Sequence, residues 1–193
     1  MSSWYKKLRE YFPEKEMKTK EHFELLLKEK KGLYQIIDDM EYILVYFEKL
    51  DYIFIDYILV KGTTRGKGIG SMVLNELKKR GKTIILEVEP VTIQDPDSER
   101  RIRFYERNNF KKIDSIRYER IHNITNELNQ MDIYCWSEAP VSDAWVLNRM
   151  ADAYLEVHCF GVKEIYGRDP QPVEEVIWFE DSKARTDVSK VIV

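Results

Sequence analysis

The sequence has few of the residues that build disulfide scaffolds and metal sites. It contains two cysteines and three histidines in 193 residues. Cys135 and Cys159 lie far apart and outside any Cys-x-x-Cys pair, so we expect free buried thiols, no thiol nucleophile and no metal. His22, His122 and His158 are scattered along the chain. We interpret all three as structural or surface residues.

Long apolar runs are also missing. No segment approaches the roughly 20 apolar residues of a membrane helix, and the first residues lack an apolar stretch of signal-peptide length. We therefore expect a cytoplasmic protein that does not associate with a membrane.

The chain also lacks a strong net charge. Its 31 Lys and Arg residues nearly balance 34 Asp and Glu residues, for a net charge of −3. No basic field therefore favours nucleic acid. The arginines of residues 99–107 alternate with Glu99 and Glu106, which is typical of a solvated helix face rather than an RNA site. We expect no nucleic-acid partner.

Hydrophobic periodicity predicts a mixed α/β fold. Residues 17–30 form an amphipathic pattern that Thr19 can cap and Gly32 ends. The apolar stretch 33–60 breaks twice, which predicts three antiparallel strands in a meander. A glycine loop, a helix at 71–80 with Ile69, Met72, Val73 and Leu77 on its apolar side, and a strand at 83–89 follow. Such a crossover normally makes its two strands parallel neighbours.

The second half of the chain predicts further elements. We expect a helix at 98–109, strands at 111–117 and 131–136, a long helix at 142–158, and a strand at 173–179 before a polar segment at 180–190. This pattern indicates a core domain over residues 1–140. Residues 141–193 would form an extension, a helix plus a strand, packed on it.

A glycine-rich run at residues 65–70 lies between a strand and a helix, where free N–H groups and the helix dipole attract anions. Glycines let the backbone approach a phosphate closely, and Arg65 and Lys67 add positive charge. A Walker A loop is excluded because it needs Gly at position 61 and Ser or Thr at position 68. A dinucleotide fingerprint needs Gly at position 71, which is serine; Glu87 or Glu89 stands near the place of a ribose-binding acid and keeps that alternative open.

The same run resembles the pyrophosphate loop of the GNAT superfamily of N-acetyltransferases. Arg65, Gly68 and Gly70 stand at the positions of its Arg-x-x-Gly-x-Gly motif. A later segment adds to the resemblance, because Tyr105 and Phe110 match the family's helix tyrosine and strand-opening phenylalanine. Order and spacing agree over about residues 17–136, and the chain is identified as a member of the stand-alone bacterial type.

The resemblance implies an acyl-CoA N-acyltransferase fold with a C-terminal helical extension, and acetyl-CoA as cosubstrate without a metal. It also implies acetyl transfer by direct attack of an amine on the thioester, with a small molecule or a peptide as the unidentified acceptor. Tyr105 would protonate the leaving thiolate. The coenzyme would contact the backbone near Leu59 and Val60 and the loop residues Arg65, Gly66, Lys67, Gly68, Ile69 and Gly70.

The attacking amine must lose its proton, either to a general base or through burial that lowers the pKa of the amine. An amine with a pKa of about 10.4 costs roughly 4–5 kcal/mol to deprotonate at pH 7. Strand alternation at 83–89 places Glu87 and Glu89 on the face that Ile85 shares, so both are candidate bases. A salt-bridged face is an equal alternative, and Asp56 is a lesser candidate.

Two other function classes stay open. The same fold can serve as a non-catalytic acyl-CoA-binding or regulatory module. Residues 142–193 could also make this an interaction protein, by forming a homodimer face or by covering the acceptor site.

Overall fold

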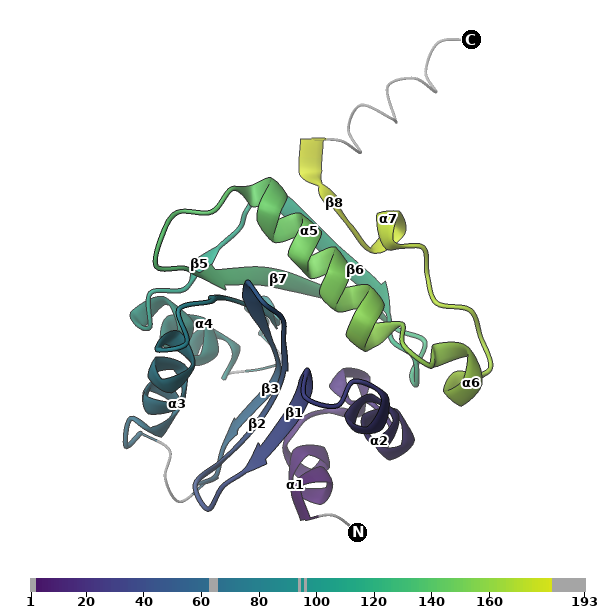
Figure 1. Cartoon of the computed structure of the whole chain (residues 1–193), viewed down its shortest axis with the longest axis horizontal. Helices are drawn as coiled ribbons and strands as arrows, with labels where there is room; N and C mark the ends of the chain where they lie inside the picture. The colour runs from purple at the N-terminus through teal and green to yellow at the C-terminus, as the bar shows by residue number, and fades with distance from the viewer. Residues whose placement is uncertain (1–2, 63–65, 94, 96, 182–193) are drawn as a thin grey trace.

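A mixed β-sheet forms the centre of the computed structural model, which describes residues 3–62, 66–93, 95 and 97–181. The strand order is β1-β2-β3-β4-β7-β6-β8, and β5 also pairs with β7. Figure 1 shows this sheet between two groups of helices. The strands are β1 (Tyr34–Asp38), β2 (Tyr42–Glu48), β3 (Tyr52–Val60), β4 (Thr83–Val88), β5 (Lys111–Lys112), β6 (Ile116–Ile121), β7 (Leu128–Trp136) and β8 (Ile177–Phe179).

Helices cover both faces of the sheet, with α3 and α4 on one side and α1, α2 and α5 on the other (Figure 1). Each group seals its own apolar core. The helical segments are α1 (Ser3–Tyr11), η1 (Glu14–Glu16), α2 (Lys20–Glu29), α3 (Ile69–Lys78), α4 (Ser98–Arg107), α5 (Asp143–Ala153), the π-helical turn η3 (Tyr154–His158), α6 (Val162–Tyr166) and α7 (Val173–Val176).

The predicted meander and crossover are confirmed. β1 pairs antiparallel with β2 and β2 with β3, whereas β3 and β4 are parallel neighbours joined through α3. In β2, Ile43, Val45 and Phe47 enter the core under α1 and α2, and Leu44 and Tyr46 enter the core under α3 and α4. The sheet is therefore buried on both faces along its middle strands.

Helix caps and stripes largely follow the sequence pattern. The Thr19 hydroxyl accepts a hydrogen bond from the His22 amide at 3.3 Å, as expected for the N-cap of α2. In α3, Val73, Leu74 and Leu77 are buried, but Met72 is 43% exposed, so its predicted place on the apolar side was wrong. The buried stripe runs through i, i+3, i+4 and i+7 from Gly70, which turns position 72 outward.

Several boundaries differ from the predicted ones. The predicted strand at 111–117 divides into β5 and β6, separated by a turn in which the Ile116 amide donates to the Ile113 carbonyl. The predicted strand at 173–179 begins as α7, where Pro172 precedes two acidic residues that favour a helical first turn. Most of the polar segment at 180–190 lies outside the described residues.

The N-terminal helix α1 was not predicted. Its Leu8 is fully buried, and Trp4 and Tyr5 pack edge-on against Phe23 of α2. The long helix at 142–158 is confirmed in position, with the Ser142 hydroxyl accepting from the Trp145 amide. Its last turn is the π-helical η3.

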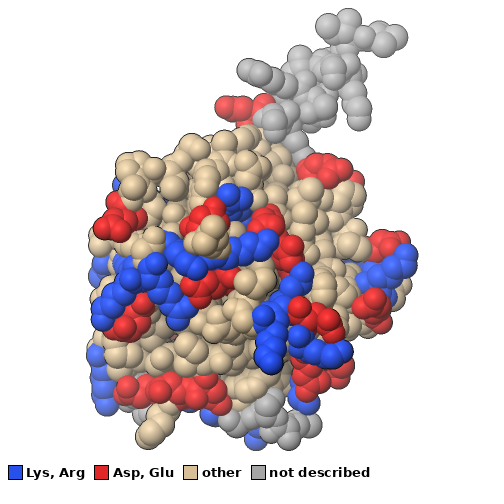
Figure 2. All heavy atoms as spheres, in the orientation of Figure 1, with Lys and Arg blue, Asp and Glu red and all other residues tan. Residues whose placement is uncertain are grey.

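Basic and acidic side chains are interspersed over the face shown in Figure 2, as the near-zero net charge leads one to expect. Within the described residues, no helix is long and apolar enough to cross a membrane.

The contact between α3 and α4 gives a first test. A Cβ on Gly70 would lie 2.9 Å from Cζ of Phe104, so Gly70→Ala should lower the free energy of unfolding by about 1–3 kcal/mol through overpacking. Urea denaturation measures this value. Met72→Ala, at an exposed position of the same helix, is the control and should change stability little. A Gly70→Ala protein as stable as the parent would contradict the packing described.

Candidate active site

A cavity of about 730 Å³ lies where β3 and β4 separate. The recorded pairing between these parallel strands runs from Tyr52 and Thr83 to Ile55 and Leu86, yet β3 continues to Val60 and β4 to Val88. The segment of β3 after Ile55 therefore faces the cavity instead of a neighbouring strand. The cavity volume is in the range of small-molecule and cofactor sites.

A β-bulge lies at the same point. Val45 of β2 faces Tyr57 whereas Tyr46 faces Ile55, so Asp56 is the extra residue on β3. The Lys18 ammonium pairs with the Asp56 carboxylate at 2.7 Å, and the Tyr34 hydroxyl also donates to it. Asp56 lines the cavity, but its carboxylate is occupied by a buried cation and a phenol.

The glycine loop forms one wall of the cavity. Gly66 and Gly68 have φ values of +81° and +82°, which glycine adopts without strain, and Gly68 is the N-cap of α3. No side chain of the described residues caps this helix, so among them nothing competes with a ligand for its first N–H groups. A Cβ at Gly66 or Gly68 would meet no atom within 4 Å, which shows that the loop borders open space.

The predicted coenzyme residues occupy different places around this wall. Gly66, Gly68, Ile69, Gly70 and Val60 line the cavity. Lys67 is exposed beside it, and the Leu59 side chain is buried in the core under α1 and α2. Arg65 lies outside the described residues.

Tyr105 lines the cavity from α4, where its ring packs edge-on against Phe104 and Phe110. Burial raises the pKa of its phenol, so the hydroxyl is protonated at neutral pH and can donate a proton. Among the described residues, none shares a hydrogen bond with this hydroxyl. Tyr105 is therefore placed as a donor facing the cavity.

Glu87 is buried at the end of β4 and held by other residues. His158 Nε2 lies 2.9 Å from its carboxylate and Arg120 Nε 3.9 Å. Burial opposes the charge of Glu87, but His158 and Arg120 outweigh it and lower the pKa to about 2. Burial and the Lys18 ammonium lower the pKa of His158, so a neutral imidazole donates Nε2–H to the Glu87 carboxylate.

Glu89 follows β4 and is also paired. Its two oxygens meet Lys15 at 3.0 Å and Arg101 at 3.4 Å. Arg101 continues the network to Asp95 at 2.7 Å. Glu89 lines the cavity, as the sequence pattern led us to expect, but as a member of a salt-bridge network.

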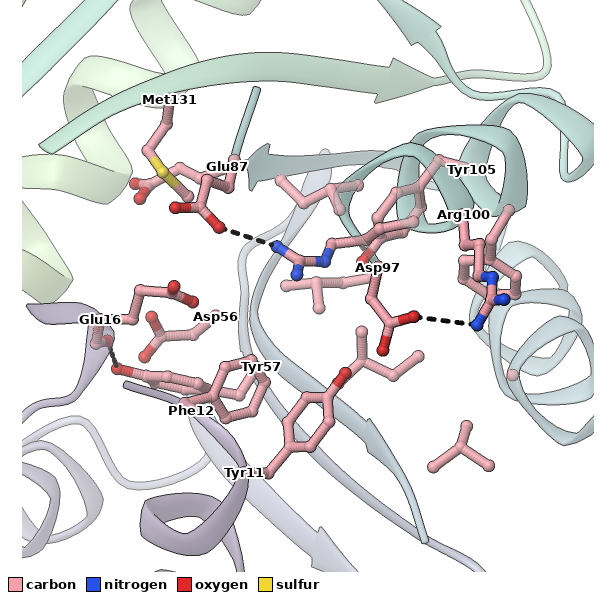
Figure 3. A pocket seen from close by; sticks show the side chains of 18 of the residues that line it. Tyr11, Phe12, Glu16, Asp56, Tyr57, Glu87, Asp97, Arg100, Tyr105 and Met131 are labelled. Carbon is pink, nitrogen blue, oxygen red and sulfur yellow. Dashed lines mark hydrogen bonds and ion pairs between the residues drawn. The ribbon is translucent and has the colours of Figure 1, made fainter. Parts of the chain in front are cut away.

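Glu16 was missed by the sequence analysis. It ends η1, between α1 and α2, and lines the cavity. Burial, and then the neighbouring Glu89 charge, raise the pKa of its carboxyl to about 7. No ion pair or hydrogen bond to this carboxylate is recorded within the described part of the chain. Figure 3 shows Glu16, Asp56 and Glu87 on one side of the cavity, with Tyr105 and Arg100 coming from α4 on the other.

The three histidines are all buried or nearly so. His22 contacts the Tyr166 hydroxyl and His122 the Met17 carbonyl, which agrees with structural roles. His158, which we interpreted from the sequence as a structural or surface residue, also lines the cavity, because η3 places it beside Glu87.

Arg120, Asn129 and Met131 also line the cavity, and no sequence motif indicated them. Cys135 is buried and Cys159 half-buried, both as free thiols.

Comparisons with known proteins bear on the family and the fold of the chain. Residues 1–110 match the model of the "Acetyltransferase (GNAT) family". The chain is 40% identical over 186 residues to the Bacillus subtilis (strain 168) protein named "Putative acetyltransferase YjbC", covering 96% of this chain and 97% of that one.

A solved structure from Bacteroides thetaiotaomicron, described as a "Putative acetyltransferase from GNAT family", has the same fold. Its TM-score is 0.64 at 20% identity, over 86% of this chain and 92% of that one. The expected GNAT fold is therefore confirmed, and the chain belongs to the acetyltransferase (GNAT) family.

Proposed function

We propose that this chain transfers the acetyl group of acetyl-CoA to a primary amine by direct attack of the amine on the thioester. The observation that carries the proposal is one cavity that joins an anion-binding helix N-terminus, a buried protonated phenol and a carboxyl with a pKa of about 7. These are the three groups that binding, leaving-group protonation and amine deprotonation require.

The walls of the cavity fit a CoA thioester. Residues 66–71 would hold the diphosphate, because backbone N–H groups and the α3 dipole favour an anion at that point. The edge of β3 after Ile55 would hold the pantetheine arm, since main-chain groups there face the cavity rather than β4. Arg100 and Arg107, which line the cavity from α4, add positive charge.

The base that we propose is Glu16 rather than Glu87 or Glu89. A carboxyl with a pKa near 7 is about half ionised at neutral pH and is a far stronger base than one with a pKa of about 2. Glu89 is engaged by two cations. Glu87 instead positions His158 and Arg120.

Different residues of the chain would carry out the separate proton-transfer and stabilisation steps. The thioester supplies an activated acyl carbon when it is bound. Glu16 takes the proton of the acceptor ammonium, so that a neutral amine is available for attack. The Tyr105 hydroxyl gives its proton to the departing sulfur. Backbone N–H groups on the β3 edge orient the acetyl carbonyl and stabilise its developing charge.

We also propose that residues 1–140 form the transferase core and residues 141–193 a packed extension that completes the site. His158 of the extension reaches Glu87, and β8 pairs with β6. Cytoplasmic location and a homodimer stay predictions from the sequence.

Replacing the proposed acid tests the mechanism. Tyr105→Phe should lower kcat about 100-fold with little change in the KM for acetyl-CoA, because only leaving-group protonation is lost. Thiol release with an amine acceptor measures both constants. Tyr134→Phe is the control, because Tyr134 packs against the Tyr105 ring. Unchanged kcat in Tyr105→Phe would exclude the acid role, and acetyl-CoA binding without turnover in the parent protein would favour a non-catalytic binder.

The pH profile tests the base. Activity should rise with pH through an apparent pKa of about 7, because Glu16 must be ionised to accept a proton. Glu16→Gln should remove this limb and lower kcat/KM about 100-fold. Glu14→Gln, an exposed neighbour, should leave both unchanged. Glu87→Gln should keep the limb, since the pKa of Glu87 is about 2. Retention of the limb in Glu16→Gln would show that another group is the base.

A further inference from the structure

We propose that the acceptor amine also carries a carboxylate, as a free amino acid does, and that Arg120 and Asn129 bind this carboxylate. The inference rests on the proposed function and specifies its acceptor. It assigns a role to two buried side chains that the transfer chemistry leaves unused.

Arg120 and Asn129 are direct partners on neighbouring strands. The register of β6 and β7 places them opposite each other, so their side chains leave the sheet on the same face. Both line the cavity, and they are only 8% and 5% exposed. The next pair on this face is Tyr118 and Met131, of which Met131 also lines the cavity. The two side chains therefore form one polar site on the cavity wall, with Glu87 beside Arg120.

Within the described part of the chain, both side chains have N–H donors without a hydrogen-bond partner. Arg120 donates no hydrogen bond to any described residue, and its Nε, 3.9 Å from Glu87, is beyond hydrogen-bond distance. Nδ2 of Asn129 is buried without a partner as well. Buried guanidinium and amide donors are almost always hydrogen-bonded in folded proteins. Unused donors in two side chains that line a cavity therefore indicate a ligand with acceptor oxygens.

A carboxylate fits these donors better than a single carbonyl does. The planar guanidinium presents two parallel N–H groups that match the two carboxylate oxygens, and Asn129 can add a third donor. The Arg120 charge stays on at all working pH values, because Glu87 beside it raises the guanidinium pKa against the effect of burial. The site is thus a permanent cation with free donors.

The charge balance of the cavity supports an acceptor that carries one positive and one negative charge. Lys18 is matched by Asp56, and Arg120 by Glu87. A zwitterion adds one negative charge at Arg120 and one positive charge near Glu16, so the buried net charge is unchanged. A polyamine or an aminoglycoside would place further ammonium groups near Arg120 and Lys18, where like charges repel in a poorly solvated site.

The experiment compares three acceptors that share one side chain. CoA release is first screened with the free L-amino acids. The best of them is then compared with its amide and with the amine that lacks the carboxyl group. Because the three amino groups differ in pKa, kcat/KM is expressed for the neutral amine. We expect the decarboxylated amine and the amide to be about 30-fold poorer acceptors than the amino acid.

Variants of Arg120 and Asn129 test whether these two residues cause the preference for acceptors that carry a carboxylate. Arg120→Lys keeps the charge that faces Glu87 but loses the two-pronged geometry, and Asn129→Ala removes one donor. Each should reduce the preference for the carboxylate to about threefold, while kcat/KM for the decarboxylated amine stays near the parent value. Arg117→Lys, on β6 but paired with Glu180, is the control and should keep the full preference.

The outcomes are distinguishable. Equal kcat/KM for the three acceptors, or an amide as good as the acid, overturns the proposed carboxylate site while leaving the transferase intact. An equal loss for all three acceptors in Arg120→Lys and Asn129→Ala shows a structural role and also overturns it. Absence of CoA release with every amine tested removes the proposed function, and this inference with it.

Discussion

The separation of β3 from β4 is the constraint on which the rest of this site depends. Both strands extend past Ile55 and Leu86, where their recorded pairing ends, and the bulge at Asp56 turns β3 at the same point. A continuous sheet would have filled this space with ladder hydrogen bonds. Instead the parted strands leave a cavity between them, beside the N-terminus of α3. The fold thereby leaves the first N–H groups of α3 and the edge of β3 beside the cavity, which are the groups that our proposal assigns to the coenzyme.

Ion pairing distinguishes the carboxylates that border the cavity from one another. Five of them border the cavity, and four are held by cations or a histidine: Asp56 by Lys18, Glu87 by His158 and Arg120, Glu89 by Lys15 and Arg101, and Asp97 by Arg100. Only Glu16 lacks such a partner within the described residues. Desolvation, and then the neighbouring Glu89 charge, therefore raise the pKa of Glu16 to about 7. Arg120 is a related case: Glu87 balances its charge, but its N–H groups donate no hydrogen bond to any described residue.

Local pattern was enough to predict the scaffold of the site. The meander, the glycine turn, the α3 crossover and the shared face of Ile85 and Glu87 all follow from periodicity and turn chemistry within about 40 residues. Tyr105 was found through the family motif. Local pattern could not identify Glu16, Arg120, Asn129 and His158. Their positions at the cavity depend on contacts between segments that lie far apart in the sequence. Glu16 needs η1 to dock against the cavity, Arg120 needs the β6–β7 register, and His158 needs the π-helical turn of η3.

The central claim is that a CoA thioester occupies the gap between β3 and β4 with its diphosphate on the α3 N-terminus. Amide hydrogen exchange of the purified, nucleotide-free protein with and without saturating acetyl-CoA tests this directly. Protection should increase in residues 66–71 and in β3 after the bulge, and little elsewhere on the sheet. If these two segments exchange at the same rate with and without acetyl-CoA, the account is contradicted.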